Sequence, residues 1–155
     1  MKSISSYDQM EDLDAESKYL VHKAKEATES AYAPYSKFHV GAALILDDGT
    51  LVTGSNQENA SYPLSMCAER VAIFAAIASH PGKTIKKLAI VAHRKNHKEL
   101  AHTPPCGACR QVLLEVEERQ KSNLAIVFLG QEDKWQVSPS VSVLLPHHFD
   151  RKSLL

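Results

Sequence analysis

The sequence predicts an α/β domain in which strands and helices alternate along the chain and pack in layers. Short apolar runs typical of buried strands alternate with longer stretches whose apolar residues recur at helical spacing. The chain has 155 residues, of which 44% are hydrophobic and 23% charged, and this suits one domain with a single core. We therefore expect one domain over residues 13–155, preceded by a flexible polar arm over residues 1–12.

The first part of this domain should hold a helix followed by a β-hairpin. Asp12 or Asp14 can cap the start of the helix, and the helix should end before Pro34, because proline disfavours helical geometry in the residue ahead of it. The hairpin joins a strand over residues 38–46 to a strand over residues 51–55. An Asp-Gly turn links them, and this dipeptide readily supplies the positive φ that such turns need.

Helices and strands alternate through the rest of the domain. The helix predicted over residues 68–79 is rich in alanine, so it can approach neighbouring elements closely. In chain order, the pattern predicts a helix over 68–79, a strand over 87–93, a helix over 107–120, a strand over 123–129 and a short strand over 134–137. The hairpin should be antiparallel and the later strands parallel, which gives a mixed sheet of roughly five strands.

Composition and charge favour a small neutral ligand over a polymer or a membrane. Eighteen basic and eighteen acidic residues cancel, so no general attraction to nucleic acid or to an anionic lipid surface is expected. The N-terminus lacks the apolar segment of a secretory signal, and no stretch approaches the ~18 apolar residues of a membrane span. Three cysteines, two of them in Cys-x-x-Cys spacing, favour reduced thiols and metal in a cytoplasmic protein over a disulfide framework.

Two short motifs hold all three cysteines and carry the chemistry predicted for this chain. Cys67 begins Cys-Ala-Glu-Arg, and Cys106 and Cys109 lie in Pro-Pro-Cys-Gly-Ala-Cys. Three thiolates can fill three corners of a tetrahedral zinc site and leave the fourth corner for water, as in a catalytic site. Each motif borders a predicted helix, whose N-terminal dipole favours deprotonated thiols. Glu69 is then placed to handle the proton of that water.

Two neighbouring residues should tune this site. Arg70 adds a positive charge beside Cys67, which matters because three thiolates on one divalent cation leave a net charge of about minus one. Gly107 is expected to permit the tight backbone that turns the sulfurs of Cys106 and Cys109 toward one point.

Other interpretations fit parts of this pattern. A lone Cys-x-x-Cys is also typical of a redox pair or of half a structural zinc site, and a closed site needs a fourth ligand such as His102. Glu69 taken alone is more typical of an exposed acid at a helix start than of a catalytic residue. The presence of Cys67 and Glu69 in one motif favours the open, catalytic site.

The two motifs together resemble those of the zinc nucleobase deaminases, in which His or Cys, followed two residues later by glutamate, precedes Pro-Cys-x-x-Cys. Further segments extend the likeness to the small homotetrameric cytidine deaminases, from about residue 15 to residue 155. These are Phe-His-Val-Gly-Ala-Ala-Leu at 38–44, Asn-Gln-Glu-Asn-Ala-Ser-Tyr at 56–62, Pro-Cys-Gly-Ala-Cys-Arg-Gln at 105–111 and Leu-Leu-Pro-x-x-Phe at 144–149. The resemblance implies a three-layer α/β/α cytidine-deaminase-like domain with a mixed, roughly five-stranded sheet.

The resemblance also implies a reaction. One Zn²⁺ per subunit is bound by Cys67, Cys106 and Cys109, with water or hydroxide in the fourth position. Glu69 takes the proton of this water, protonates N3 of the cytosine ring and later protonates the departing ammonia. The implied activity is hydrolytic deamination of cytidine and 2′-deoxycytidine to uridine and 2′-deoxyuridine, in pyrimidine salvage.

A nucleoside pocket follows from the same resemblance. It places Asn56 and Glu58 on the ribose 3′-hydroxyl, Phe38 against the base and the backbone N–H of Ala68 near the pyrimidine O2. An amide and a carboxylate with one residue between them on an extended segment point the same way. Without the resemblance, Asn56 and Glu58 fit equally well as a turn amide and a solvated acid, and Phe38 as an apolar residue at a strand start.

Part of each pocket should come from a neighbouring subunit. The resemblance implies a homotetramer in which Ala60, Tyr62 and Phe149 complete the pocket of a neighbour, although Phe149 by itself is an ordinary tail aromatic. The sequence departs from the family pattern at Gln57, where an aliphatic residue is usual, and at Val143, beside Ser142, where an acid is more common.

Three other functions compete with this one. The chain could deaminate another cytosine-containing nucleoside, such as a nucleoside antibiotic, although the Asn56 and Glu58 pair favours an ordinary ribose. It could edit RNA or DNA, which the neutral charge and the lack of a basic stripe disfavour. It could be a non-catalytic zinc module, against which Glu69 counts.

Overall fold

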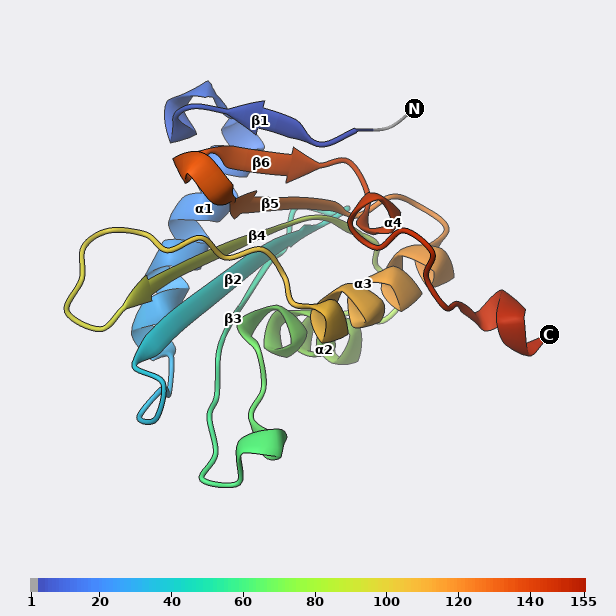
Figure 1. The fold of residues 1–155 in the computed structure, drawn as a ribbon. Helices are drawn as coiled ribbons and strands as arrows, with labels where there is room; N and C mark the ends of the chain where they lie inside the picture. The colour runs from blue at the N-terminus through green and yellow to red at the C-terminus, as the bar shows by residue number, and fades with distance from the viewer. Residues whose placement is uncertain (1–2) are drawn as a thin grey trace.

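The computed structural model describes residues 3–155, which form one mixed sheet covered by helices on both faces (Figure 1). The strands are β1 (Ser5–Tyr7), β2 (Phe38–Leu46), β3 (Leu51–Ser55), β4 (Ile85–Arg94), β5 (Ala125–Leu129) and β6 (Trp135–Ser138). The helices are α1 (Ala15–Ala27), α2 (Ala68–Ser79), α3 (Gly107–Gln120) and the short α4 (Val141–Leu144). The sheet has six strands in the order β1-β6-β5-β4-β2-β3.

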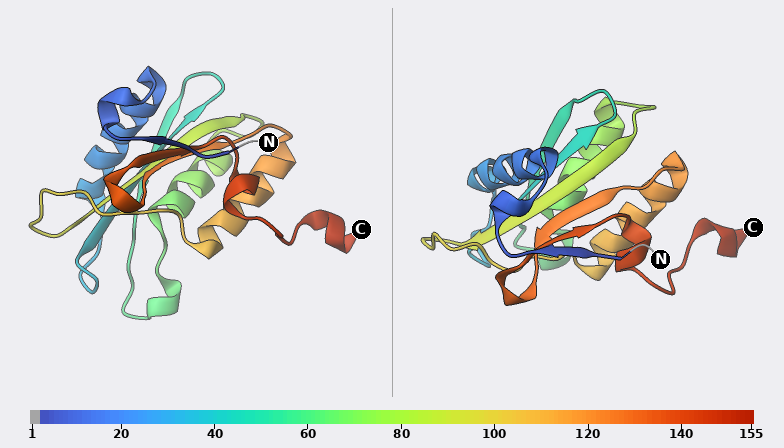
Figure 2. Two further views of the ribbon diagram at one scale, coloured as in Figure 1. Left: turned by 45° about the horizontal axis from the view of Figure 1, so that its top comes forward. Right: turned by 90° about the horizontal axis from the view of Figure 1, so that it is seen from above.

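Helices lie on both faces of the sheet and make three layers (Figure 2). On one face, Leu20 and Val21 of α1 pack into one buried cluster. On the other face, Ile73 of α2 and Leu113 of α3 belong to a second cluster, which extends to α4. The α/β/α fold predicted from the sequence is thereby confirmed. None of the helices in residues 3–155 has the length and apolarity needed to cross a membrane.

Strand β2 divides its side chains between the two cores. Ala42 and Leu44 pack with α2 and α3, whereas Ala43, between them, packs with α1. Because both faces of the strand are covered, its sequence is apolar almost throughout and does not alternate with polar residues. The strand can therefore carry functional residues only near its ends.

Two glycines let helices approach the sheet closely. A Cβ at Gly41 would overlap the carbonyl oxygen of Ala24 in α1. A Cβ at Gly54 would lie 2.6 Å from the carbonyl oxygen of Ala68 and 2.5 Å from the backbone nitrogen of Ala72, both in α2. Gly54 therefore sets the distance between β3 and the first turns of α2.

The start of α1 follows one of the two predicted caps. Asp14 is the N-cap, and its carboxylate accepts hydrogen bonds from the Ser17 backbone N–H at 2.9 Å and the Ser17 hydroxyl at 2.6 Å. The Lys87 ammonium lies 3.1 Å from the same carboxylate and ties the helix start to β4.

The N-terminal segment differs from the prediction of a flexible arm over residues 1–12. Its first two residues lie outside the described range, but Ser5–Tyr7 pairs antiparallel with β6 and adds a sixth strand. Tyr7 and Met10 pack against the core on the α1 side. A three-residue strand at a sheet edge has too few positions to show alternation in sequence, which is why it was missed.

The strand directions also differ in part from the prediction. Strands β4 and β5 are parallel, as expected for strands joined through a helix. The prediction is wrong for β6, which pairs antiparallel with β5. Only the short segment Gly130–Lys134 joins these two strands, and a parallel connection needs a crossover of about a dozen residues or more.

Candidate active site

The three cysteines converge at the starts of two neighbouring helices. Cys67 is the N-cap of α2, Cys106 is the N-cap of α3, and Cys109 lies in the first turn of α3, where it is fully buried. Their sulfur atoms all lie within 4.8 Å of one another. The fold therefore joins two motifs that are far apart in the sequence into one cluster of thiols.

Positive electrostatic potential surrounds this cluster. The Arg70 guanidinium donates a hydrogen bond to the sulfur of Cys67 at 3.5 Å, and the N-termini of α2 and α3 both point their partial positive charge at the thiols. Hydrogen bonds from the Cys109 thiol and from Arg70 lower the pKa of Cys67 to about 5. Cys67 is therefore held as a thiolate, the form that binds metal.

Three sulfur donors at this spacing fit zinc. With Zn–S bonds of about 2.3 Å, the sulfurs of a tetrahedral site lie roughly 3.8 Å apart, which the cluster reaches with small shifts. No fourth Cys, His or carboxylate joins the cluster among residues 3–155. His102, the candidate for a closed site, instead pairs with Asp133 at 2.8 Å. The donor set thus provides three protein ligands.

Glu69 is buried beside the thiols. Glu69 lies in the first turn of α2 and is only 5% exposed to solvent. It lines the same cavity as Cys67 and Cys106. Desolvation by burial raises the pKa of this carboxyl above its usual value. A carboxyl with a raised pKa holds a proton more readily than an ordinary glutamate does, which suits a group that accepts and returns a proton.

One cavity of about 340 Å³ opens onto the thiols and Glu69. The sequence-predicted residues Phe38, Asn56, Glu58 and Ala68 all line it. A volume of this size lies within the range of pockets for small molecules. The structure therefore brings the predicted ligand-binding residues of β2 and of the segment after β3 to the metal cluster.

Asn56 and Glu58 also have structural partners that the sequence did not reveal. The Asn56 side chain accepts from the Val40 N–H and donates to the Phe38 carbonyl, both at 2.9 Å, and so it holds the start of β2. The Glu58 carboxylate accepts from the backbone N–H groups of Tyr35 and Ser36, at 3.0 and 3.1 Å. Each side chain retains further hydrogen-bonding capacity for a ligand.

The hydrogen bonds from Tyr35 and Ser36 also determine the ionisation state of Glu58. Partial desolvation acts to raise its pKa, but the bonds from Ser36 and Tyr35 outweigh it, and the pKa of Glu58 lies below its usual value. The carboxylate is therefore ionised at neutral pH and can accept hydrogen bonds from hydroxyl groups.

Three predicted residues lie outside this cavity within one chain. Ala60 is exposed, Tyr62 is 69% exposed, and Phe149 is 59% exposed. The Tyr62 ring packs edge-on against Tyr35 and lines a small adjoining hollow, which Glu58 shares.

The glycine between the paired cysteines does not have the predicted role. Gly107 is the first residue of α3 and has no positive φ, and a Cβ there would contact nothing within 4 Å. The helix start itself orients the sulfurs of Cys106 and Cys109, so the sequence-based reason for this glycine was wrong.

Several cavity residues were not singled out from the sequence. Thr103 and Pro104 precede Cys106, and Ser65 and Met66 precede Cys67. Their closeness in sequence to the metal ligands could have indicated that they line the cavity. Ser36 and Val40 also line the cavity. Ser36 gave no signal, because its position depends on the bond between its backbone and Glu58.

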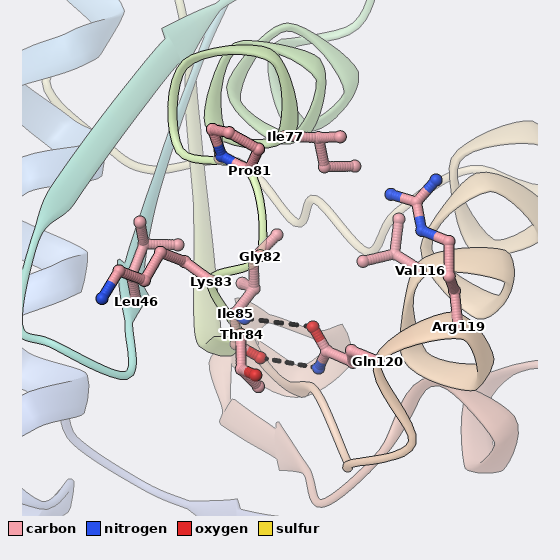
Figure 3. Close-up of a pocket in the computed structure, with 11 residues that line it drawn as sticks. Leu46, Ile77, Pro81, Gly82, Lys83, Thr84, Ile85, Val116, Arg119 and Gln120 are labelled. Atoms are coloured by element: carbon pink, nitrogen blue, oxygen red, sulfur yellow. Dashed lines mark hydrogen bonds between the residues drawn. The ribbon is translucent and has the colours of Figure 1, made fainter.

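A larger cavity, of about 430 Å³, lies at the other ends of α2 and α3 (Figure 3). The Gln120 side chain bridges to the backbone N–H and carbonyl of Ile85 at 3.0 and 2.9 Å, and Lys83 pairs with Asp48 at 3.4 Å. Among residues 3–155, no cysteine, histidine or carboxylate lines this cavity. It therefore offers neither a metal ligand nor a general base.

The chain is similar to known proteins over most of its length. The family model of the cytidine and deoxycytidylate deaminase zinc-binding region matches residues 14–123. A cytidine deaminase of Halalkalibacterium halodurans is 42% identical over 137 residues, which cover 87% of this chain and 95% of that protein. A probable cytidine deaminase of Dictyostelium discoideum is 33% identical over 135 residues, which cover 87% of this chain and 84% of that protein.

Solved structures agree with these sequence matches. The crystal structure of cytidine deaminase from Burkholderia pseudomallei superposes with a TM-score of 0.71 at 42% identity, covering 88% of this chain and all of that chain. The structure of cytidine deaminase from Mycobacterium tuberculosis gives a TM-score of 0.68 at 38% identity, covering 88% of this chain and 99% of that chain.

Proposed function

The chain belongs to the family of zinc-dependent cytidine and deoxycytidylate deaminases, and on this premise we propose that its site deaminates cytidine and 2′-deoxycytidine by hydrolysis. The products are uridine or 2′-deoxyuridine and ammonia, and the activity serves pyrimidine salvage. The observation that supports this most strongly is the joint placement of the cysteine cluster and buried Glu69 on one cavity.

The cysteines and Glu69 divide the chemistry between them. Cys67, Cys106 and Cys109 would hold zinc, and zinc bound there would lower the pKa of water to about 7 and so supply hydroxide for C4 of cytosine. Glu69 accepts one proton from water and delivers it to ring N3. It then accepts the remaining proton from the hydroxyl group on C4 and delivers it to the amine, which leaves as ammonia. Its burial beside the thiols, on the same cavity, supports this role.

The cavity walls orient the nucleoside. Phe38 packs against the base, and the Ala68 N–H, which has no acceptor inside its helix, donates to the pyrimidine O2. The ionised Glu58 carboxylate accepts from the ribose hydroxyls, and Asn56 completes this contact with its remaining hydrogen-bonding capacity.

We propose that the working form is a homotetramer with one zinc ion per subunit. Ala60, Tyr62 and Phe149 are exposed and lie outside the cavity of their own chain, which supports a role at the site of a neighbouring subunit. We also propose a cytoplasmic location, because three free thiols are stable as metal ligands only where they stay reduced.

A substrate panel tests this function. Zinc-loaded protein is incubated with cytidine, 2′-deoxycytidine and a cytidine-containing oligonucleotide at equal cytosine concentration. We expect stoichiometric release of ammonia from both nucleosides and none from the oligonucleotide. Release from the oligonucleotide alone, or from none of the three, contradicts the proposal.

A further inference from the structure

A second group of metal-ligating side chains lies outside the site described above. Glu118 of α3 and His148 and Asp150 of the C-terminal tail each place one ligand atom within 4.8 Å of the other two. All three residues are partly buried. Figure 1 shows the tail passing beside the C-terminal half of α3, which brings these residues together.

His148 has the orientation of a metal-binding histidine. Its Nδ1 lies 2.8 Å from the carbonyl oxygen of Leu145, and a carbonyl can only accept, so Nδ1 carries the proton. Nε2 then faces the acidic side chains and lies 3.8 Å from Oδ2 of Asp150. Histidines that bind metal through one ring nitrogen usually donate the other N–H in this way.

The carboxylates of Asp150 and Glu118 are also arranged in a way that favours binding of a cation. Asp150 is oriented by a bond from the Lys152 N–H to its Oδ1 at 2.9 Å, and its side chain is only 15% exposed. Oε2 of Glu118 is shielded from solvent and has no hydrogen-bond partner among residues 3–155. A carboxylate oxygen in this condition is unfavourable unless a cation pairs with it.

We propose that Glu118, His148 and Asp150 bind a divalent metal ion, for which zinc is the best match. One imidazole nitrogen and two carboxylate oxygens suit Zn²⁺, and two carboxylates with a neutral imidazole carry the charge that a dication neutralises. Ligands of one such ion lie roughly 3–3.5 Å apart, so rotations of the side chains close the remaining distance. Water fills the rest of the coordination shell.

The ion would fasten the C-terminal tail to α3. His148 and Asp150 flank Phe149, whose carbonyl oxygen already accepts a bond from the Gln111 side chain at 2.9 Å. The metal therefore adds a second attachment around this exposed aromatic residue. The site needs nothing from the deaminase reaction, and its ligands are separate from the three cysteines.

Calorimetric titration of Zn²⁺ into protein that already holds one zinc per chain tests the proposal. We expect wild type to bind one further equivalent, and His148→Asn and Glu118→Gln to bind it at least tenfold more weakly. His147→Asn is the matched control, because His147 is the neighbouring histidine outside the cluster and its φ of 55° is one that asparagine tolerates. This control should keep the second equivalent.

A second measurement follows the tail directly. Added zinc should slow tryptic cleavage after Arg151 and Lys152 in wild type and in His147→Asn but not in His148→Asn. If wild type takes up no second equivalent, or if His148→Asn and His147→Asn bind zinc equally, the cluster does not hold a metal ion and the proposal is overturned. Because both readouts follow metal and not turnover, failure here leaves the deaminase proposal unaffected.

Discussion

Arg70 joins the thiolate cluster to the catalytic helix. Its guanidinium donates to the sulfur of Cys67 and adds positive charge where three thiolates would otherwise leave an excess of negative charge. We therefore expect Arg70 to contribute to zinc affinity without being a metal ligand.

Replacing Arg70 with alanine should weaken zinc binding by about 10–100-fold, because the Cys67 thiolate loses its hydrogen-bond donor. Competition with a chelator of known affinity measures the change. Arg119→Ala, at an exposed position of α3, is the control and should bind zinc as wild type does. Equal affinity in the two variants would show that the guanidinium does not stabilise the metal site.

Asp14 should make the stability of α1 depend on pH. Partial burial acts to raise its pKa, but the bonds from Ser17 and the Lys87 ammonium hold the pKa at about 2, below the unfolded value of about 4. A lowered folded-state pKa stabilises the protein above the unfolded value, and this stabilisation is lost as the pH falls from about 4 to about 2.

Asp14→Ala should therefore lower the free energy of unfolding by about 0.5–2 kcal/mol at pH 7, because the helix loses its cap. The difference from wild type should shrink as the pH falls below 4. Thermal or denaturant unfolding at several pH values measures it, with the exposed Asp8→Ala as control. A difference that stays constant to pH 2 would exclude a charged cap.

Residue types and spacing predicted the chemistry of the site but not its complete lining. Cys67, Cys106 and Cys109 could be proposed as metal ligands because three thiols can hold zinc, but the resemblance to the zinc nucleobase deaminases was needed to specify the proton-transfer steps of Glu69. The bonds that hold Asn56 and Glu58 to the backbone around β2 could not be predicted, because they depend on how the loop after β3 folds back.

Helix α2 carries Glu69 and begins at Cys67, and its position depends on β3. Gly54 lies directly beneath its first turns, and any side chain there would meet the backbone of Ala68 and Ala72. The placement of the catalytic residues is therefore sensitive to a strand residue that does not line the cavity.

Gly54→Ala should destabilise the protein by about 1–3 kcal/mol and lower kcat, because the added methyl group pushes the start of α2 away from the sheet. Gly107→Ala is the matched control, since a Cβ there contacts nothing and alanine favours a helix. Unfolding curves and turnover of both variants provide the comparison. Equal stability and turnover in the two variants would contradict the close packing described here.

Periodicity predicted the long elements well and the edges of the sheet poorly. The sequence placed α2 and α3 at their observed bounds because each has a clear start and stop signal. Strand β1 was not predicted, because three residues are too few to show the two-residue alternation of a strand. The direction predicted for β6 was wrong, because strands joined by so short a connection pair antiparallel. The pairing of β1 with β6 joins segments far apart in the sequence, which local pattern does not encode, whereas the direction of β6 follows from the short connection Gly130–Lys134.

The assembly of the molecule should decide whether each cavity is complete. Phe149 is exposed on a tail that leaves the core, and Tyr62 lies on a loop that projects from the sheet (Figure 1). In a tetramer these residues can enter the sites of other subunits, whereas a monomer would lack one wall of its pocket.

Phe149→Ala should retain zinc but lower kcat/KM by about tenfold, because an aromatic contact with the substrate of a neighbouring subunit is lost. Coexpression of Phe149→Ala with Glu69→Gln should restore activity above the sum of the two, since mixed tetramers contain sites with both native residues. Phe74→Ala, at another exposed aromatic residue, is the control for the single variant. A fully active monomer, or the absence of complementation, would contradict shared pockets.

We propose that three cysteines hold zinc while Glu69, which is not a ligand, moves the protons. The most direct test measures zinc content and cytidine turnover together in Glu69→Gln, with the exposed Glu115→Gln as control. We predict that Glu69→Gln keeps its tightly bound zinc and loses about 10²–10⁴-fold in kcat, while the control matches wild type. Undiminished turnover in Glu69→Gln, or loss of its zinc, would contradict the account.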